Sequence, residues 1–299
     1  MSTAVGKTMR VRTDDGVELH AEVSGSGPDI LFLHEFSGDH RSWSAQVEHF
    51  SRRYRCIVFS ARGFAPSDVP QELARYSQQR AAQDAVAVLD AVGSERAHLV
   101  GMSMGAFTGL NVALGWPERV ASATAISCGY GADTDPETFR AEMEEMGAMI
   151  RERGCGHLAE LTGASPYRLA LAHKDPRQFE LWKSMLAEHD AVGQSNTIVG
   201  VQRDRPTLLQ LGERFGDCPV PLLFVAGDED DPVLEANIAV KRKSPLAALA
   251  VLPRTAHTIN HEEPDLLNRT LLDFVTWVDA GSWPTRDPRS LPAGGGWIR

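Results

Sequence analysis

The chain has 299 residues, 42% hydrophobic and 23% charged, which suits one large α/β domain with an insertion or two small domains. Its formal net charge of −10, without a long basic run, argues against nucleic acid and acidic membrane surfaces as partners. No secretory signal pattern opens the chain and no stretch approaches the roughly 20 continuous apolar residues of a membrane helix, so we expect a cytoplasmic protein.

The first part of the chain alternates between strand-like and helix-like segments. Residues 9–13 and 17–25 are short strand patterns joined by Asp-Asp-Gly, a hairpin signal. Continuous apolar runs at 29–34 and 54–60 are typical of strands buried on both faces, and residues 77–92 have helical spacing. Further segments predict a helix around Trp43, Val47 and Phe50, strands from 97 and over 119–127, and a helix between these two strands.

This alternation stops at residue 133. Residues 133–217 are helix-like throughout, with many charges and no strand-like runs, and the strand pattern returns at 221–227 and 247–252. We therefore expect an α/β fold with a mostly parallel sheet covered by helices on both faces. The predicted parts are a core of residues 1–132 and 218–280, a helical cap of residues 133–217 over the strand ends, and an extended C-terminal tail of residues 281–299.

The four cysteines are widely scattered and form no C-x-x-C pair, so we expect buried, reduced thiols. They are Cys56, Cys128, Cys155 and Cys218.

The segment 97–106 carries the strongest functional signal. An apolar run stops at Gly101-Met102-Ser103-Met104-Gly105, and small and apolar residues follow, which predicts a strand, a sharp turn and a helix. Glycines at both ends let the helix double back on the strand, and Ser103 at the tip needs a strained backbone with positive φ. The helix N-terminus after it favours developing negative charge. The pattern is that of a nucleophile elbow.

A serine nucleophile needs a base, and the base needs an acid that orients it. The strand at 221–227 leads into Asp228-Glu229-Asp230-Asp231-Pro232, and the strand at 247–252 leads to His257. The order serine, aspartate, histidine is the one that α/β-hydrolases use.

With these residues the chain resembles an α/β-hydrolase with a helical cap, in the branch related to bacterial esterases, cofactor-free haloperoxidases and meta-cleavage-product hydrolases. The resemblance covers about residues 9–280 and rests on HEFSG, RGFAPS, GMSMG, GDEDDP and AHTINHEEP. It implies that Ser103 is the nucleophile, His257 the base and Asp230 the acid. It also implies that the backbone N–H groups of Phe36 and Met104 hold the oxyanion, and that no cofactor or metal is needed.

The choice of acid stays open among three carboxylates. Asp230 fits the resemblance, whereas Asp231 before Pro232 is typical of a helix cap. Asp228 directly follows a glycine and is expected to bond to turn backbone.

Three residues depart from the family pattern, namely Glu35 after the loop histidine, Ser60 after the fourth strand and Ala256 before the catalytic histidine. Glu35 matters most, because it puts a carboxylate beside an oxyanion donor. It either turns away and pairs with an arginine, with Arg62 as a candidate, or faces the pocket and selects substrates by charge.

Within the cap, Trp182, Tyr167 and Phe179 are the aromatic residues expected to shape a substrate pocket. Three methionines at 143, 146 and 149 lie on one side of a helix, a pattern that suits core packing and also a substrate wall. His257 and His261 are four residues apart, but a turn rather than a helix is expected there, so this spacing does not predict a metal site.

The function expected from these residues is hydrolysis of an ester or related acyl bond of a small molecule through an acyl-enzyme. Carbon–carbon bond hydrolysis is an alternative, although Met102 and Glu35 do not match the asparagine and the glycine-rich loop usual in those enzymes. Perhydrolase or haloperoxidase-like chemistry is a second alternative, and a non-catalytic ligand receptor on the same fold is a third. The sequence leaves the oligomeric state open, a homodimer included.

Overall fold

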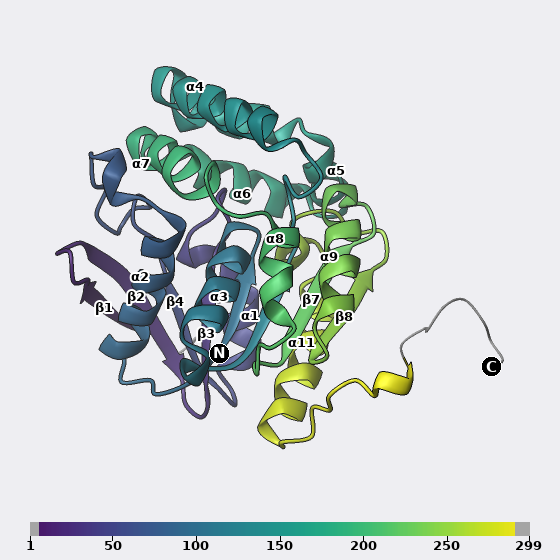
Figure 1. Ribbon diagram of the computed structural model, residues 1–299. Helices are drawn as coiled ribbons and strands as arrows, with labels where there is room; N and C mark the ends of the chain where they lie inside the picture. Colours follow the sequence, from purple (N-terminus) through teal and green to yellow (C-terminus); the bar gives the residue numbers. More distant parts are fainter. Residues whose placement is uncertain (1–5, 291–299) are drawn as a thin grey trace.

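A central sheet of eight strands organises the computed structural model, which describes residues 6–290 (Figure 1). The strand order is β1-β2-β4-β3-β5-β6-β7-β8. Strand β2 is antiparallel to both of its neighbours, and the six strands β3 to β8 are mutually parallel. The predicted α/β class with a mostly parallel sheet is confirmed. The strands are β1 Lys7–Arg12, β2 Glu18–Gly25, β3 Asp29–Leu33, β4 Arg55–Phe59, β5 Ala97–Met102, β6 Val120–Ile126, β7 Leu222–Gly227 and β8 Ala247–Leu252.

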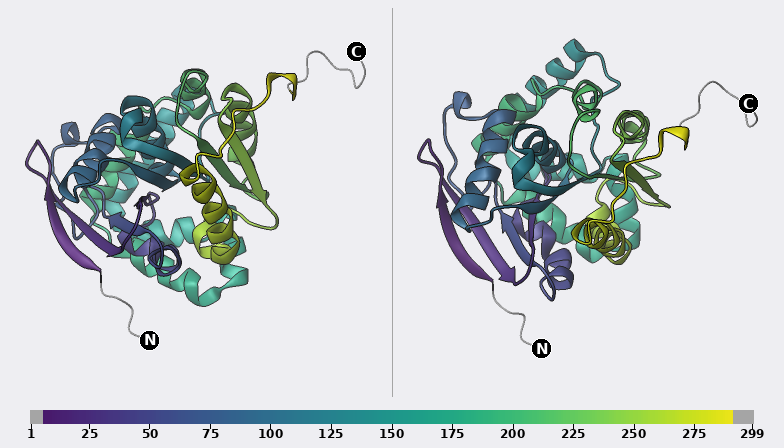
Figure 2. Two further views of the ribbon diagram at one scale, coloured as in Figure 1. Left: turned by 90° about the horizontal axis from the view of Figure 1, so that it is seen from below. Right: turned by 60° about the horizontal axis from the view of Figure 1, so that its bottom comes forward.

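Helices cover both faces of this sheet, and their apolar stripes build two core clusters. One face packs against α2, α3, α8 and α9, and the other packs against α1 and α11. In Figure 2 the hairpin of β1 and β2 forms one edge of the molecule. These helices are α1 Ser44–Phe50, α2 Gln78–Ala91, α3 Met104–Gly115, α8 Leu208–Gly212, α9 Asp231–Lys243 and α11 Pro264–Asp279.

The parallel register brings the carboxyl ends of the strands to a common edge. Leu33 of β3 pairs with Gly101 of β5, and Gly227 of β7 pairs with Leu252 of β8. The loops that follow these strands therefore start side by side. In open α/β sheets this is the edge where ligands bind.

Four further helices and a π-helical turn form a layer above that edge (Figure 1). This layer has its own buried apolar cluster, which includes Ile150, Trp182 and Leu186. The first helix is interrupted at Gly154, whose φ of 77° is not helical. The elements are α4 Pro136–Gly163, α5 Pro166–Lys174, α6 Pro176–Ala187, α7 Ala191–Thr197 and the π-helical turn Ile198–Gln202.

The end of the predicted cap range packs with the core instead. Leu208, Leu211 and Phe215 belong to the core cluster that includes Ala236 and Val240 of α9. We therefore propose that the cap ends near residue 205 rather than at 217.

Residues 281–290 follow α11, and the Trp283 indole N–H donates to the backbone oxygen of Leu246 at 2.9 Å, so this part of the predicted tail lies against the core. Residues 291–299 of that tail lie outside the described residues.

Within residues 6–290, no helix has the length and apolar character that crossing a membrane requires. All four cysteines are buried and unpaired.

Candidate active site

The turn between β5 and α3 has the geometry of the predicted elbow. Ser103 adopts φ 50° and ψ −111°, and its backbone N–H donates to the oxygen of Ile126 at 2.8 Å. A Cβ on Gly101 would come within 2.3 Å of the Gly105 oxygen, and one on Gly105 within 2.1 Å of the Leu33 oxygen. Only glycine fits at either position, which explains how the helix approaches the strand so closely. The predicted strained turn is confirmed.

The loops after β7 and β8 bring a histidine and a carboxylate together. His257 Nδ1 lies 2.8 Å from Asp230 Oδ2, and Asp230 is 1% exposed. Burial disfavours the charged imidazole, but the Asp230 carboxylate outweighs it and raises the pKa of His257 above its usual value. The bond to the carboxylate uses Nδ1 and leaves Nε2 as the free nitrogen.

The other two carboxylates of this loop do not reach the histidine. Asp231 is exposed at the start of α9, and Asp228 accepts the backbone N–H of Thr255 at 3.1 Å. Among the three candidates for the acid, Asp230 is thus the one in contact with His257.

A cavity of about 480 Å³ opens between the sheet edge and the helical layer. Its core side includes Ser103, Asp230, His257, Glu35 and Phe36. Its other side is largely apolar and comes mainly from α4, α5 and the π-helical turn. The lining there includes Met143, Met146, Leu158, Leu161, Tyr167, Arg168, Ile198 and Gln202.

A family model for the α/β hydrolase fold matches residues 28–264, which covers both sides of this cavity. The chain belongs to the α/β-hydrolase family. It is a hydrolase of that fold.

Similar proteins span almost the whole of this hydrolase. A Bacillus subtilis protein provisionally named 2-succinyl-6-hydroxy-2,4-cyclohexadiene-1-carboxylate synthase is 24% identical over 91% of this chain and 99% of its own length. A 2-hydroxy-6-oxononadienedioate/2-hydroxy-6-oxononatrienedioate hydrolase of Burkholderia vietnamiensis is 27% identical over 91% of this chain and 96% of its own. The structure of a thermophilic esterase from Thermogutta terrifontis superposes with a TM-score of 0.81 at 24% identity, covering 91% and 99% of the two chains.

Glu35 of this hydrolase both lines the cavity and pairs with an arginine. Its Oε2 accepts Nη2 of Arg168 at 2.8 Å, and both side chains are buried. Burial alone would favour the neutral acid, but the Arg168 cation outweighs it and lowers the pKa of Glu35 below its usual value. The carboxylate is therefore ionised and neutralised by its partner.

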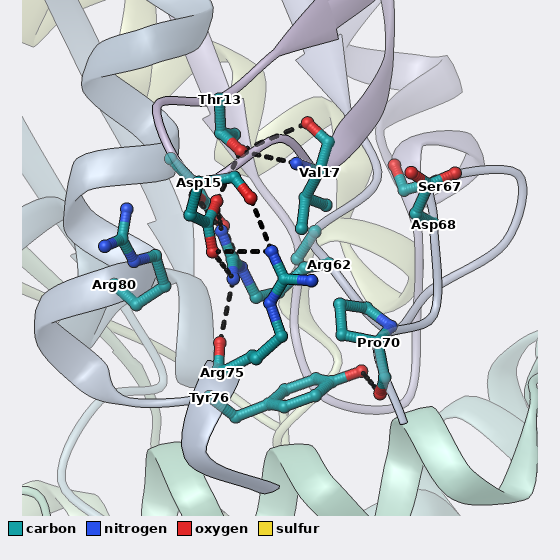
Figure 3. Close-up of polar contacts among 12 residues, drawn as sticks. Thr13, Asp15, Val17, Arg62, Ser67, Asp68, Pro70, Arg75, Tyr76 and Arg80 are labelled. Atoms are coloured by element: carbon teal, nitrogen blue, oxygen red, sulfur yellow. Dashed lines mark hydrogen bonds and ion pairs between the residues drawn. The ribbon is translucent and has the colours of Figure 1, made fainter. Parts of the chain in front are cut away.

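Arg62, the arginine expected from the sequence, is engaged elsewhere (Figure 3). Its guanidinium bonds to Asp84 at 2.6 Å and to Asp15 at 2.9 Å, so the predicted Arg62 pairing is wrong. The true partner lies 133 residues from Glu35, in α5 of the cap. This contact joins core and cap across the cavity.

Arg205 is a second cation of the cavity that sequence reasoning missed. Its guanidinium lies 3.7 Å from the centre of the Phe107 ring and donates to two neutral oxygens, those of Tyr130 and Gln202, at 3.3 and 3.4 Å. No carboxylate of the described residues forms an ion pair with it. Burial lowers the pKa of Arg205 to about 10, which leaves it charged at neutral pH.

The structure separates the three cap aromatics. Tyr167 lines the cavity, but Trp182 is 0% exposed, stacks against Phe179 and does not line it. The Trp182 ring packs under the Arg168 guanidinium at 4.6 Å, and we propose that Trp182 supports this cavity-lining residue rather than contacting substrate itself. Phe179 is likewise absent from the lining.

The two residues expected to hold the oxyanion lie on the core side. Phe36 lines the cavity, whereas the Met104 side chain does not and only its backbone can serve there. Met104 is the first residue of α3, so its N–H belongs to the helix turn that has no partner within the helix. The loop before Phe36 is braced by His34, which donates from Nδ1 to the Glu35 oxygen at 2.8 Å and accepts the Ala61 N–H at 2.9 Å.

Proposed function

We propose that the protein is a serine hydrolase that cleaves an ester or related acyl bond of a small molecule through an acyl-enzyme on Ser103. The observation that carries this proposal is the 2.8 Å contact between His257 and buried Asp230 in the cavity that Ser103 also lines. The strained elbow conformation of Ser103 supports it further.

In this mechanism the Asp230 carboxylate accepts a hydrogen bond from Nδ1–H of His257 and so fixes the tautomer in which Nε2 is the base. His257 Nε2 takes the hydroxyl proton of Ser103 while the serine oxygen attacks the substrate carbonyl. The imidazolium then gives this proton to the leaving alcohol. A water molecule, deprotonated by the same nitrogen, then attacks the acyl-enzyme carbonyl. The bond between the acyl group and the Ser103 oxygen breaks, the imidazolium returns its proton to that oxygen, and the acid is released.

The tetrahedral intermediate carries a negative oxygen, and we assign its stabilisation to the N–H groups of Phe36 and Met104. One such donor contributes about 3 kcal/mol to lowering the barrier in comparable sites. A free carboxylate at Glu35 would oppose this charge. Its ion pair with Arg168 cancels that opposition and explains how a glutamate is tolerated beside the donors.

The charge balance of the cavity indicates the substrate class. Glu35 and Arg168 neutralise each other, and the Asp230 carboxylate is engaged by His257. Arg205 is charged and forms no ion pair with a carboxylate among residues 6–290. A partly buried cation of this kind favours a substrate with a carboxylate at that end of the pocket. The Burkholderia vietnamiensis relative, whose name gives a dienedioate substrate, acts on a dianion.

That relative also gives weight to a second candidate, hydrolysis of a carbon–carbon bond in a vinylogous diketone acid. Arg205 would bind the acid of such a substrate equally well. Met102 and Glu35 depart from the residues usual in those enzymes, so we place ester hydrolysis first.

The proposal is tested with a fluorophosphonate probe and a panel of acidic and neutral esters. The probe should add its mass to the peptide that contains Ser103, and Ser103→Ala should lower kcat by at least about 10³-fold with an unchanged fold. Ser165→Ala is the matched control, because Ser165 lines the same cavity and its side chain makes no capping bond. Labelling of another residue, or ester turnover retained by Ser103→Ala, would overturn the assignment. A vinylogous diketone acid turned over faster than every ester would favour the second candidate.

A further inference from the structure

We propose that His20, Glu22 and His40 form a binding site for a divalent ion of the Zn²⁺ class. The site lies on β2 and the short 3₁₀ helix at His40–Trp43, and none of its three residues lines the cavity described above. It is therefore a second site, independent of the hydrolytic one.

The three ligand atoms lie within 4.8 Å of one another. His20 and Glu22 are two residues apart on a strand, so their side chains leave the same face. Glu22 Oε1 lies 3.1 Å from His20 Nε2 and 3.6 Å from His40 Nε2. Two ligands at about 2.0–2.1 Å from a tetrahedral zinc ion are roughly 3.3 Å apart, and both distances lie close to that value.

The surroundings of His40 orient it as a ligand. Its Nδ1 bonds to the hydroxyl of Ser60 at 2.8 Å, which turns Nε2 towards Glu22. A bond of this kind at the second nitrogen is the usual support of a metal-binding imidazole. Both histidine side chains are 12% exposed, and Glu22 is 37% exposed.

A cavity of about 270 Å³ adjoins the site at His40 and is also lined by Arg41, Ala65, Pro66, Glu188 and His189. A bound ion would tie β2 to the segment at 39–43. That segment also contacts the cap, since Asp39 lies 3.5 Å from His189 and Arg41 bonds to Glu188 at 2.8 Å. Metal binding should therefore stabilise the fold at the junction of core and cap.

The donor set selects the kind of ion. Two imidazoles and one carboxylate suit Zn²⁺ and Co²⁺, whereas Mg²⁺ and Ca²⁺ prefer sites built wholly from oxygen. Three protein ligands leave a fourth position for water. We expect Zn²⁺ to bind and millimolar Mg²⁺ to have no effect.

The experiment titrates chelator-treated full-length protein with Zn²⁺ by calorimetry and with Co²⁺ by visible absorption. One equivalent should bind, and Zn²⁺ should raise Tm by several degrees. Glu22→Gln and His20→Gln should each weaken Kd by at least about tenfold and abolish the rise in Tm. Glu22→Gln is the safer variant, because it preserves size at a side chain that is partly exposed.

Two control variants separate this site from other histidines. His49→Gln removes an exposed histidine of α1, and His257→Gln removes the histidine beside Asp230. Both should keep one equivalent of Zn²⁺ with the affinity of the wild type. Wild-type protein that binds no stoichiometric metal, or binding that survives in Glu22→Gln and disappears in His257→Gln, would overturn the proposal and leave a hydrogen-bonded cluster without a metal.

Discussion

The two walls of the cavity are built in different ways. The core wall takes its polar residues from loops that directly follow strands, as with Ser103 after β5 and His257 after β8. The cap wall takes its residues from helices whose positions depend on a separate apolar cluster around Trp182 and Leu186. The first wall is fixed by backbone geometry, and the second is fixed by packing.

This difference suggests a division of labour. Residues of the core wall should act on the reacting bond of every substrate, so their loss should lower kcat. Residues of the cap wall should act on the remainder of the substrate, so their loss should change KM and selectivity. Glu35 and Arg168 join the two walls and should show both effects.

The largest effect that tests this division is expected at the acid. Asp230→Asn should lower kcat by about 10³-fold on all esters, because the amide cannot hold the tautomer of His257 that Asp230 selects. Asp231→Asn is the matched control and should stay within about twofold, since Asp231 is exposed and does not contact His257. Steady-state kinetics on one acidic and one neutral ester measure both variants, and a larger loss in Asp231→Asn would contradict the assignment.

The pH dependence of kcat/KM is a second measurement that tests the role of Asp230. His257 must be neutral to act as a base, and its pKa is raised in the folded protein, so kcat/KM should fall at acid pH with a midpoint above 6.5. The stability contributed by the raised pKa is present below about pH 6.5 and is lost as pH rises through the folded pKa. Residual activity of Asp230→Asn should have a lower midpoint, and an unchanged midpoint would show that Asp230 does not set this pKa.

The sequence predicted the core wall well because each of its signals is local. Gly101, Ser103 and Gly105 form a turn that only those residues can make, and the order serine, aspartate, histidine follows the strands. The sequence could not decide between Asp230 and Asp231, because the two residues are adjacent. The structure shows that Asp230 contacts His257 and that Asp231 is exposed to solvent.

The cap wall could not be predicted in the same way. Arg168 meets Glu35 across 133 residues, and no periodicity or motif marks such a contact. A large aromatic residue in the cap sequence suggests a pocket residue, but such residues more often build an apolar core. Trp182 belongs to the buried apolar cluster of the cap. The cluster of His20, Glu22 and His40 was missed for the same reason, because its third member joins only when the chain folds.

The next effect concerns the ion pair between the walls. Arg168→Met should lower stability by about 3 kcal/mol, because it leaves Glu35 buried without its cation. It should also lower kcat, since the unpaired carboxylate then opposes the oxyanion. The double variant Glu35→Gln with Arg168→Met should recover most of both losses. Urea denaturation and kinetics test this, and a double variant no better than Arg168→Met would exclude charge as the cause.

The pH dependence of that pair follows from the lowered pKa of Glu35. A carboxylate whose pKa falls on folding contributes stability above its unfolded pKa of about 4.3, and this contribution is lost as pH falls through the folded value. The stability difference between wild type and Glu35→Gln should therefore be constant from pH 5 to 6, below the range in which His257, whose pKa Glu35 also raises, titrates. A difference that changes within this range would show that Glu35 titrates there.

A smaller and more selective effect is expected at Arg205. Arg205→Gln should raise KM for an acidic ester by about 10- to 30-fold, the range of a lost charge-assisted hydrogen bond, and leave a neutral ester of the same length within twofold. Arg203→Gln is the control, because Arg203 pairs with Glu144 and Asp204 and does not line the cavity. Equal losses on both esters would mean that Arg205 supports the cavity rather than binding a carboxylate.

The smallest effect separates the inside of the cap from its cavity surface. Tyr167→Ala widens the cavity and should shift preference towards longer acyl chains by about fourfold, the value of one buried methylene group. Trp182→Phe should leave that preference unchanged, because Trp182 has no exposed surface and touches the site only through Arg168. A smaller ring weakens the contact with the guanidinium by about 0.5–1 kcal/mol, so Trp182→Phe should show a slight loss of stability. Chain-length profiles and thermal unfolding of both variants decide the matter. If Trp182→Phe shifted the chain-length preference and Tyr167→Ala did not, Trp182 rather than Tyr167 would be the residue that contacts the acyl chain.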